Sequence, residues 1–578
     1  MSTTLSLTTS GSALEQFYET VRASGKPIIT GALEALEVST RISDTDVERI
    51  PRSGGCVVVA NHPTGMLDGL VAAAVLQRVR RDVKILANHL LAAVPELESS
   101  IIPVDLVSDP NRAARTNVAA MRRAIEHVAG GGMLLVFPAG EVSRFQWSSW
   151  SAADRGWNAG VVRLIRAAAR LAPRVVVLPM HLSGANTIAF HLAGAVHPRI
   201  RLVMLPRELL NKRGVQVEAR VGHPITAAKL GHVGDDAEAA EYLRWRTYLL
   251  ARRPTLKART NVPLARTKRA AAMPVIEPVA AETLRDEISA LPRDRKLAEA
   301  DGLVAYIAGA DEIPNVLTEI GRLREITFRA AGEGTGLAAD RDRFDDVYQH
   351  LFLWNESKGE IAGAYRVART GSTRALYTRT LFSYGDSFLR QMGPAIELGR
   401  SFVRLEYQRG FAPLLLLWKG IGQYVARHPE CKVLFGPVSI SNQYQTVSRE
   451  LMVAYLERRA PLTEWLGMVS SRMPFRPRVR FPARACEGLE VDDVSAVISD
   501  IEPDGRGVPV LLRQYLKLGG RLLGFNVDPD FSNALDGLIV VDLTRTEPKL
   551  LERYLGKAES AAFLAFHNNH RNEEAYAA

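Results

Sequence analysis

Short apolar runs alternate with longer segments of helical spacing through the first half of the chain. The short runs predict buried strands at residues 57–60, 83–86, 101–104, 133–137, 175–178, 200–204 and 215–221. Apolar residues at helical spacing predict helices at residues 13–40, 67–79, 113–128, 157–171 and 235–252. Such alternation predicts an α/β fold with a mostly parallel sheet and flanking helices.

The second half shows a different order of elements. A charged amphipathic helix at residues 319–329 precedes a predicted hairpin at 349–354 and 360–367. The pattern then predicts a strand-like stretch at 395–407, a helix at 414–425, a strand at 432–440 and a helix at 443–458. Further on, a helix opens near residue 507, and strand ends are expected at 525–528 and 538–543. The polar tail after His567 is expected to be mobile.

A chain of 578 residues is too long for one hydrophobic core, so at least two domains are expected. We place a helical segment at residues 1–50, a first α/β domain at 51–252, a linker at 253–275 and a second α/β domain at 276–570. The linker is rich in arginine, lysine and proline. It is either a soluble spacer or a segment that docks on anionic lipid. Electrostatic attraction to such a surface contributes about 1 kcal/mol of binding free energy per basic residue.

Composition limits the classes of partner that we expect the chain to bind and the cell compartment in which we expect it. The net charge of +10 favours an anionic partner, such as a membrane surface or an acidic carrier protein, and no nucleic-acid motif is present. No apolar run approaches a membrane span, and the N-terminus lacks the features of a signal peptide. We therefore expect a cytoplasmic protein, peripheral on the inner face of the cytoplasmic membrane. Three widely spaced cysteines suggest neither a disulfide framework nor a metal site.

A histidine and an aspartate follow the first predicted strand of the first domain. His62 stands at the carboxyl end of that strand, where open α/β sheets hold their ligands, and Asp68 lies near the start of the next helix. A carboxylate that orients an imidazole fixes its tautomer and stabilises the imidazolium. Such a pair can take a proton from a hydroxyl that attacks a thioester. A turn histidine followed by a helix-capping aspartate is the alternative.

The segment from Asn61 to Gly69, Asn-His-Pro-Thr-Gly-Met-Leu-Asp-Gly, resembles the His-x4-Asp block of the glycerolipid acyltransferases. It has one more residue between histidine and acid, a form similar to the hemolysin-like branch of that superfamily. Residues 101–105 and 177–180 resemble two further blocks of the family. The resemblance implies catalytic roles for His62 and Asp68, and we count Asn61 and Gly65 among the substrate-binding residues.

A glycine loop follows the predicted strand at residues 133–137. Its sequence, Phe-Pro-Ala-Gly-Glu-Val-Ser-Arg at residues 137–144, stands where the same family carries Phe-Pro-Glu-Gly-Thr-Arg. Backbone N–H groups of such a loop can face an anion, and an arginine can close over it. Gly140, Glu141 and Arg144 are therefore predicted to bind substrate. The acid of this loop stands at Glu141 and not directly after the proline, as it does in the family. This change indicates that the anion bound by the loop is not a phosphate. The alternatives are a solvated Arg144 and a helix-capping Glu141.

Charged residues of the second domain resemble a set found in the Gcn5-related N-acyltransferase (GNAT) fold, namely in the acyl-homoserine-lactone synthases and, more closely, in the ornithine N-acyltransferases. The matching elements are the helix with Arg324, the loop with Asp342 and Asp345, Gly-Ala-Tyr-Arg ending in Arg366, and Glu-Leu-Gly-Arg from Glu397 to Arg400. The resemblance covers about residues 300–460. It implies a GNAT-like α/β fold related to those synthases.

The chemistry of amide formation needs such residues. An amino-acid ammonium must lose a proton before it attacks a thioester, and we predict Glu397 as the catalytic carboxylate. Arg324, Asp342, Asp345, Arg366 and Arg400 are predicted to bind the acceptor or the phosphopantetheine of the donor. A structural ion-pair network of Arg324, Asp345, Arg366 and Glu397 is the alternative. Asp528 and Asp536 are further candidates, or solvated loop acids.

Together the two resemblances imply a fused synthase of an aminolipid, most simply an ornithine lipid. Its second domain would transfer a 3-hydroxyacyl chain from acyl carrier protein or coenzyme A to the amine, and its first domain would esterify the 3-hydroxyl. No permanently bound cofactor is expected. Two other functions stay open: a lysophospholipid O-acyltransferase with a non-catalytic carrier-binding second domain, and a membrane-binding hemolysin-like protein. The amino acid and the chain length are not readable from the sequence.

Overall fold

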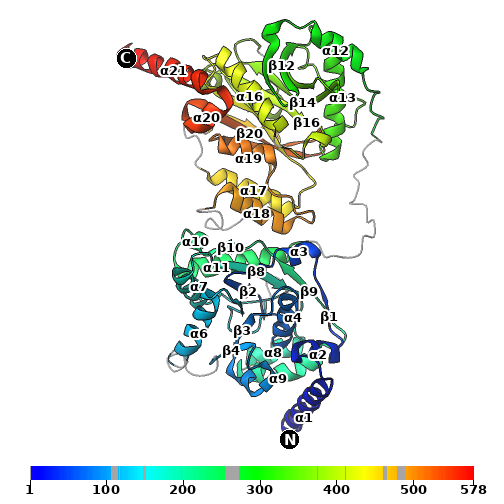
Figure 1. Cartoon of the computed structure of the whole chain (residues 1–578), viewed down its shortest axis with the longest axis vertical. Coiled ribbons are helices and arrows are strands. Elements are labelled where there is room, and N and C mark those ends of the chain that lie inside the picture. Colours follow the sequence, from blue (N-terminus) through cyan, green and yellow to red (C-terminus); the bar gives the residue numbers. More distant parts are fainter. Residues whose placement is uncertain are drawn as a thin grey trace. The chain divides into compact units, whose positions relative to one another are not determined.

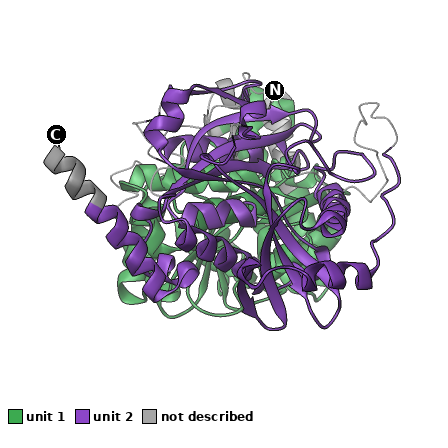
Figure 2. Ribbon diagram, turned by 90° about the horizontal axis from the view of Figure 1, so that it is seen from above, with its two compact units in different colours: residues 1–256, 483–507 green, residues 257–482, 508–578 purple. Residues whose placement is uncertain are grey.

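A computed structural model describes residues 2–105, 115, 117–146, 151–196, 198–253, 272–373, 375–410, 412–459, 465, 467–477 and 489–577. The chain forms two compact units (Figure 2). The first comprises residues 1–256 and 483–507, and the second comprises residues 257–482 and 508–578. Most of the basic linker predicted at residues 253–275 lies outside the described residues.

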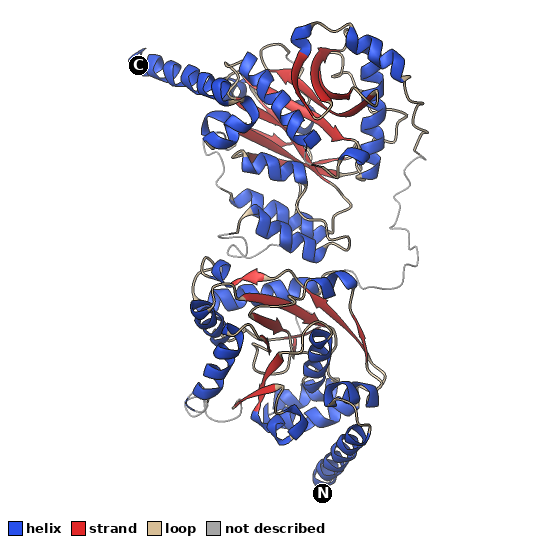
Figure 3. Ribbon diagram, viewed as in Figure 1, coloured by secondary structure: helices blue, strands red, loops and turns tan. Residues whose placement is uncertain are grey.

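The first unit is built on an eight-stranded sheet with helices on its faces (Figures 1 and 3). The strand order is β1-β9-β8-β2-β5-β3-β4, with β10 beside β8. Strands β8, β2, β5, β3 and β4 run parallel, while β9 and β10 are antiparallel to β8. The strands are β1 (Ser39–Arg41), β2 (Cys56–Ala60), β3 (Val83–Asn88), β4 (Ile101–Val104), β5 (Met133–Val136), β8 (Val176–Leu182), β9 (Gln216–Val221) and β10 (Ile225–Thr226). The predicted α/β fold with a mostly parallel sheet is confirmed.

Helices cover the two faces of this sheet. They are α1 (Ser2–Ala23), α2 (Ile28–Ala35), α3 (Asp44–Glu48), α4 (Met66–Gln77), α6 (Val118–Ala129), α7 (Gly160–Leu171), α8 (Ile188–Val196), α9 (Pro198–Leu210), α10 (Ala227–Leu230) and α11 (Asp236–Leu250). A short ribbon of β6 (Arg144–Gln146) and β7 (Ser151–Ala153) lies outside the sheet. Side chains of α2, α4 and β2 share one apolar core, and those of α7 and α11 share a second core with the other face of the strands.

The strand predicted at residues 200–204 is wrong, because this stretch lies within helix α9. A short apolar run does not by itself distinguish a buried strand from a helix segment. In α9 the side chains alternate with helical spacing, so that Leu209 is buried whereas Val203 is half exposed. The helix packs against its neighbours α8 and α4.

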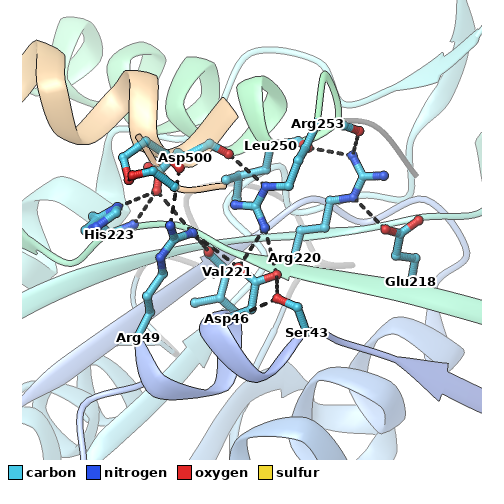
Figure 4. Close-up of polar contacts among 12 residues, drawn as sticks. Ser43, Asp46, Arg49, Glu218, Arg220, Val221, His223, Leu250, Arg253 and Asp500 are labelled. Atoms are coloured by element: carbon cyan, nitrogen blue, oxygen red, sulfur yellow. Dashed lines mark hydrogen bonds and ion pairs between the residues drawn. The ribbon is translucent and has the colours of Figure 1, made fainter. Parts of the chain in front are cut away.

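One segment of the second half packs as part of the first unit. Helix α18 (Val491–Ile501) contacts α11, and Leu489 just before it packs against the first unit's core. Asp500 of α18 is buried among polar groups of that unit (Figure 4). Its carboxylate accepts from the backbone N–H of His223 at 2.9 Å and from Arg246 at 3.0 Å, and its carbonyl oxygen accepts from Arg253 at 2.8 Å. The expected single second domain at residues 276–570 is therefore interrupted by residues 483–507.

The second unit contains an eight-stranded, mainly antiparallel sheet in the order β11-β12-β13-β14-β16-β17-β20-β19. Only the pair β16–β17 in this order is parallel. The strands are β11 (Lys296–Ala300), β12 (Leu303–Gly309), β13 (Gln349–Asn355), β14 (Glu360–Arg369), β16 (Ala395–Val403), β17 (Val433–Ile440), β19 (Arg521–Asp528) and β20 (Ala534–Asp542). A small pair, β15 (Phe382–Tyr384) and β18 (Val469–Ser471), stands beside it. The predicted hairpin of β13 and β14 is confirmed.

The helices of the second unit are α12 (Ala281–Ser289), α13 (Pro314–Ala330), α14 (Thr378–Leu381), α15 (Asp386–Met392), α16 (Ala412–Arg427), α17 (Thr446–Arg458), α19 (Val510–Lys517), α20 (Pro548–Leu555) and α21 (Lys557–Ala577). The tail expected to be mobile after His567 thus continues helix α21. Within the described part of the chain, no helix has the length and apolar character needed to cross a bilayer.

Candidate functional site

The first candidate site lies where β2 ends. All five residues of β2 are buried, and Asn61 and His62 follow directly. The Asn61 amide donates to the carbonyl oxygen of Leu182 at 2.9 Å and accepts from the backbone N–H of Leu182 at 2.7 Å. This pair of bonds ties the ends of β2 and β8 together. Asn61 thus belongs to the framework that presents His62, and its predicted contact with substrate stays a prediction.

The imidazole of His62 and the carboxylate of Asp68 lie side by side. His62 Nδ1 is 3.0 Å from Asp68 Oδ2, although the direction of approach is not that of an in-line hydrogen bond. The ring stacks on Phe137 with 4.2 Å between ring centroids, and its side chain keeps 20% exposure. One ring edge therefore faces a buried acid while the ring stays accessible. An accessible imidazole beside a carboxylate is the pairing that a general base could use.

Asp68 is fixed by the turn that separates it from His62. Its carboxylate accepts from the backbone N–H groups of Thr64 and Gly65, each at 2.8 Å, and from the Thr64 hydroxyl. Since Asp68 stands in the first turn of α4, it also caps that helix. Gly65 adopts φ 86°, and a Cβ there would lie 2.8 Å from a Leu205 methyl group. Its backbone conformation is therefore what allows the turn.

A buried aspartate that the sequence did not single out lies behind the His62 turn. Asp154 is 1% exposed, and its Oδ1 accepts from the backbone N–H of His62 at 3.3 Å and from the Ser143 hydroxyl at 2.5 Å. Its Oδ2 accepts from the indole N–H of Trp157 at 3.0 Å. Ser143 N–H in turn donates to the carbonyl oxygen of His62 at 2.8 Å. Asp154 thus joins the His62 turn to the glycine loop.

The glycine loop contains an ion pair rather than a helix cap. Arg144 donates to Glu141 Oε2 from Nε at 3.1 Å and from Nη2 at 2.6 Å. Both side chains are about one third exposed. Gly140 has φ 66°, and no helix begins at Glu141 in the described structure. The helix-capping alternative for Glu141 is therefore wrong. The predicted substrate contacts of Gly140, Glu141 and Arg144 stay predictions.

The second unit places three arginines around two aspartates. Arg324 donates to Asp345 Oδ1 at 2.8 Å, and Arg366 Nη1 lies 2.6 Å from Asp342 Oδ1 and 3.3 Å from Asp345 Oδ1. Arg400 Nη2 donates to Asp342 Oδ2 at 3.1 Å. Burial opposes ionisation of Asp345, but the charges of Arg324 and Arg366 outweigh it and hold the pKa of Asp345 well below its usual range. The five predicted residues therefore form one connected cluster.

Two of these arginines keep unusual surroundings. Arg366 is 1% exposed, and within the described structure its Nε and Nη2 atoms have no hydrogen-bond partner. Its guanidinium lies 5.1 Å from the ring centroids of both Tyr348 and Tyr377. Arg400 adopts φ 47°, rare for a residue other than glycine, and its guanidinium lies 4.1 Å from the Phe531 ring centroid. Unpartnered buried donors and strained backbone are concentrated at functional sites.

Glu397 is held by hydrogen bonds and not by an ion pair within the described structure. It accepts from the backbone N–H of Thr378 at 2.7 Å and of Tyr377 at 3.2 Å, and from the Tyr348 hydroxyl. Burial raises the pKa of Glu397 above its usual range, and the hydrogen bonds oppose that rise. The predicted alternative of a four-residue ion-pair network holds for Arg324, Asp345 and Arg366. Glu397 forms no ion pair in the described structure, although the charge of Arg366 acts on it, and its hydrogen bonds come from Tyr348, Tyr377 and Thr378.

Arg366 and Glu397 lie on the same face of the sheet. Arg366 projects to the same side of β14 as Ala368, and the register pairs Ala368 with Glu397 of β16. His350 of β13 is paired with Arg366 and lies on that face too. Strands β16 and β17 are paired in parallel over three positions, Ala395 to Glu397 with Val433 to Phe435.

The described residues contain no group of three or more His, Cys, Asp or Glu side chains arranged to hold a metal ion.

Comparisons with known proteins match both units. A family model described as an acyltransferase matches residues 23–257, and an acetyltransferase (GNAT) domain model matches residues 323–419. A glycine N(alpha)-acyltransferase of Bacteroides thetaiotaomicron is 32% identical over 294 residues, which cover 46% of this chain and 86% of the relative. An L-ornithine N(alpha)-acyltransferase of Rhodobacter capsulatus is 30% identical over 254 residues, covering 41% and 90%. A lyso-glycine lipid O-acyltransferase of Phocaeicola vulgatus is 24% identical over 233 residues, covering 39% and 78%.

Proposed function

This chain is an acyltransferase that belongs to the family of GNAT-type Nα-acyltransferases and carries a second acyltransferase domain, and on that premise we propose that it makes a diacylated aminolipid by two successive steps. The second unit forms an amide between a 3-hydroxyacyl chain and an amino acid, which we take to be ornithine. The first unit then esterifies the 3-hydroxyl with a second acyl chain. The observation that carries the proposal is the occurrence of two separate polar sites, one in each unit.

In the first step, the amine nitrogen forms a bond to the thioester carbon of the donor, and the bond from that carbon to sulfur breaks. Glu397 is suited to accept the proton that the amine loses, because burial raises the pKa of its carboxyl group. The Tyr348 hydroxyl, which donates to Glu397, gives the proton a route to the buried carboxylate. The unpartnered Nε and Nη2 donors of Arg366 can hold the acceptor carboxylate.

In the second step, His62 takes the proton from the 3-hydroxyl while the hydroxyl oxygen bonds to the carbon of a second thioester. The bond from that carbon to sulfur breaks and the thiol of the donor leaves. Asp68, 3.0 Å from Nδ1, stabilises the imidazolium that forms. The exposed ring edge leaves room for the hydroxyl, and the neighbouring Arg144 can meet the carboxylate of the lyso-aminolipid. That acceptor carries a carboxylate and no phosphate, which fits the altered glycine loop.

The donors and the site of action complete the proposal. Acyl carrier protein or coenzyme A supplies both acyl chains as thioesters, and no permanently bound cofactor is needed for either step. The net charge of +10 favours peripheral contact with an anionic membrane, where the lyso-aminolipid would be found. We place the enzyme on the inner face of the bacterial cytoplasmic membrane for that reason.

Expression in a host without aminolipids, followed by mass spectrometry of total lipid, tests the proposal. The wild-type chain should give diacylated aminolipid, His62→Ala should give the monoacylated lyso-lipid, and Glu397→Gln should give neither. The exposed His232→Ala and Glu552→Gln are matched controls and should behave as wild type. Absence of any aminolipid with wild type, together with altered phospholipid chains, would instead favour a lysophospholipid O-acyltransferase.

A further inference from the structure

Three acids gather on the face of the second sheet that carries Glu397. The antiparallel register places Asp536 of β20 opposite both Ser439 of β17 and Asn526 of β19. Directly opposed residues project to the same side, so these three side chains form a row across the sheet. Ser439 donates its hydroxyl to Glu333 at 2.7 Å, which brings that carboxylate over the row. Asp528, two residues from Asn526, projects to the same face.

Asp536 lacks a partner in this position. It is 7% exposed, and within the described structure its side chain has neither a hydrogen bond nor an ion pair. The charged groups that act on it are Asp528, Glu333 and Arg400. Nearly all buried polar groups in proteins are hydrogen-bonded, and a buried carboxylate without a counter-charge is costly. An unpartnered, buried carboxylate on which the charges of two other acids act therefore points to a missing cation.

The positively charged side chain that acts on Asp536 in the described structure is Arg400, and Arg400 already pairs with other acids. Arg400 is paired with Asp342 at 3.1 Å and lies 3.3 Å from Asp340. Burial raises the pKa of Asp528 and, together with the neighbouring acids, raises that of Asp536, so the cluster is short of positive charge. The acids do not form one of the groupings that could hold a metal ion among the described residues. A compact organic cation that can hydrogen-bond to separated carboxylates fits the arrangement better.

We propose that Glu333, Asp528 and Asp536 form a subsite for the second ammonium group of a diamino-acid acceptor. This inference rests on the proposed function of the second unit and adds the residues that would select a diamino acid over other amino acids. Arg400 lies between the two regions, since it pairs with Asp342 and also acts on Asp528 and Asp536. A substrate with a carboxylate at one end and an ammonium at the other could therefore meet arginine at one end and the three acids at the other. Glycine has no group for the acids.

Ornithine and norvaline give a matched pair of acceptors, because norvaline is ornithine without the side-chain amine. The test measures kcat/KM of amide formation for both with the purified full chain and a 3-hydroxyacyl thioester donor. Wild type should prefer ornithine over norvaline by about 100-fold, and Asp536→Asn should lower that ratio at least about 10-fold, mainly through a higher KM for ornithine, in line with the loss of a charge-assisted hydrogen bond. Putrescine should inhibit wild type competitively and Asp536→Asn much more weakly.

The outcomes separate this inference from the proposed function. If wild type acylates norvaline or glycine as well as ornithine, the ammonium subsite is refuted while the Nα-acyltransferase stands. If Asp536→Asn keeps the full ornithine preference, the subsite is likewise refuted. If no amino acid is acylated, the proposed function itself fails. Acylation of norvaline, which has no group for the subsite, reports that the second unit of the variant is folded, and Glu333→Gln gives a second variant should Asp536→Asn prove unstable. Glu552→Gln, exposed in the same unit, controls for loss of one negative charge.

Discussion

Asp154 accepts the backbone N–H of His62 at 3.3 Å, although 92 residues separate the two in the chain. The same carboxylate oxygen accepts from Ser143, so one buried group sets the position of the histidine turn against the glycine loop. Asp154 contacts His62 at the backbone N–H, so we expect its effect on the imidazole to pass through the backbone. It is therefore a positioning residue, distinct from Asp68.

We expect Asp154→Asn to lower the kcat of ester formation about 100-fold, because displacement of a catalytic group by about 1 Å has an effect of that size. Amide formation by the same chain should be unchanged. The assay supplies lyso-aminolipid and a thioester to the purified protein and follows both products. Glu126→Gln, an exposed acid of α6, is the control. Wild-type ester formation by Asp154→Asn would contradict the positioning role.

Glu397 should give amide formation a characteristic pH dependence. If its carboxylate accepts the amine proton, the rate rises with pH as that carboxyl loses its proton, and a raised pKa places the rise above the usual carboxyl range. Glu397→Gln should lower the rate about 100-fold or more. Tyr348→Phe removes a hydrogen bond that lowers the pKa of Glu397, so the rise should move to higher pH. A pH profile that is the same for Tyr348→Phe and wild type would exclude this role.

Asp345 should stabilise the second unit in a pH-dependent manner. Its folded pKa is lowered, so the stabilisation is present above the unfolded pKa, near 4, and is lost as the pH falls through the folded value. Asp345→Asn leaves Arg324 and Arg366 without their shared carboxylate, and we expect it to lower the free energy of unfolding by about 3–5 kcal/mol at pH 7. Denaturant unfolding at pH 7 and pH 3 checks this. The gap between variant and wild type should narrow at pH 3, and a constant gap would contradict the linkage.

Asp500 should fasten helix α18 to the first unit. Removal of its charge leaves the buried guanidinium of Arg246 without a counter-ion. It also takes from Arg49 one of two acids, since Arg49 pairs with Asp46 as well (Figure 4). We expect Asp500→Asn to destabilise the first unit by about 3–5 kcal/mol, and a chain of residues 1–256, which lacks α18, to melt at lower temperature than the same unit in the full chain. Calorimetry with Asp492→Asn, an exposed acid of the same helix, as control measures the effect. Equal melting temperatures would show that α18 is dispensable.

The local pattern of apolar residues was sufficient to predict most of the strands and helices. An element that is buried on one or two faces repeats its apolar residues at a regular spacing along the chain. It was also sufficient to pair His62 with Asp68, because a turn and the start of a helix bring residues this close in sequence together. The stretch at residues 200–204 shows the limit of this information. A short apolar run fits a strand and a helix equally well, and the packing of α9 against α8 and α4 decides between them.

Contacts between distant segments were decided by the tertiary structure. Asp154 reaches the His62 turn from another loop, and Asp500 reaches His223 across 277 positions of sequence. Asp536 comes within the electrostatic influence of Glu333 because the register of β17 and β20 places it opposite Ser439, which donates to Glu333. The sequence by itself determined two α/β domains and the residue types of the two proposed acyl-transfer sites. Strand order and loop packing decide which buried charges face one another. The local spacing of apolar residues carries no information about either.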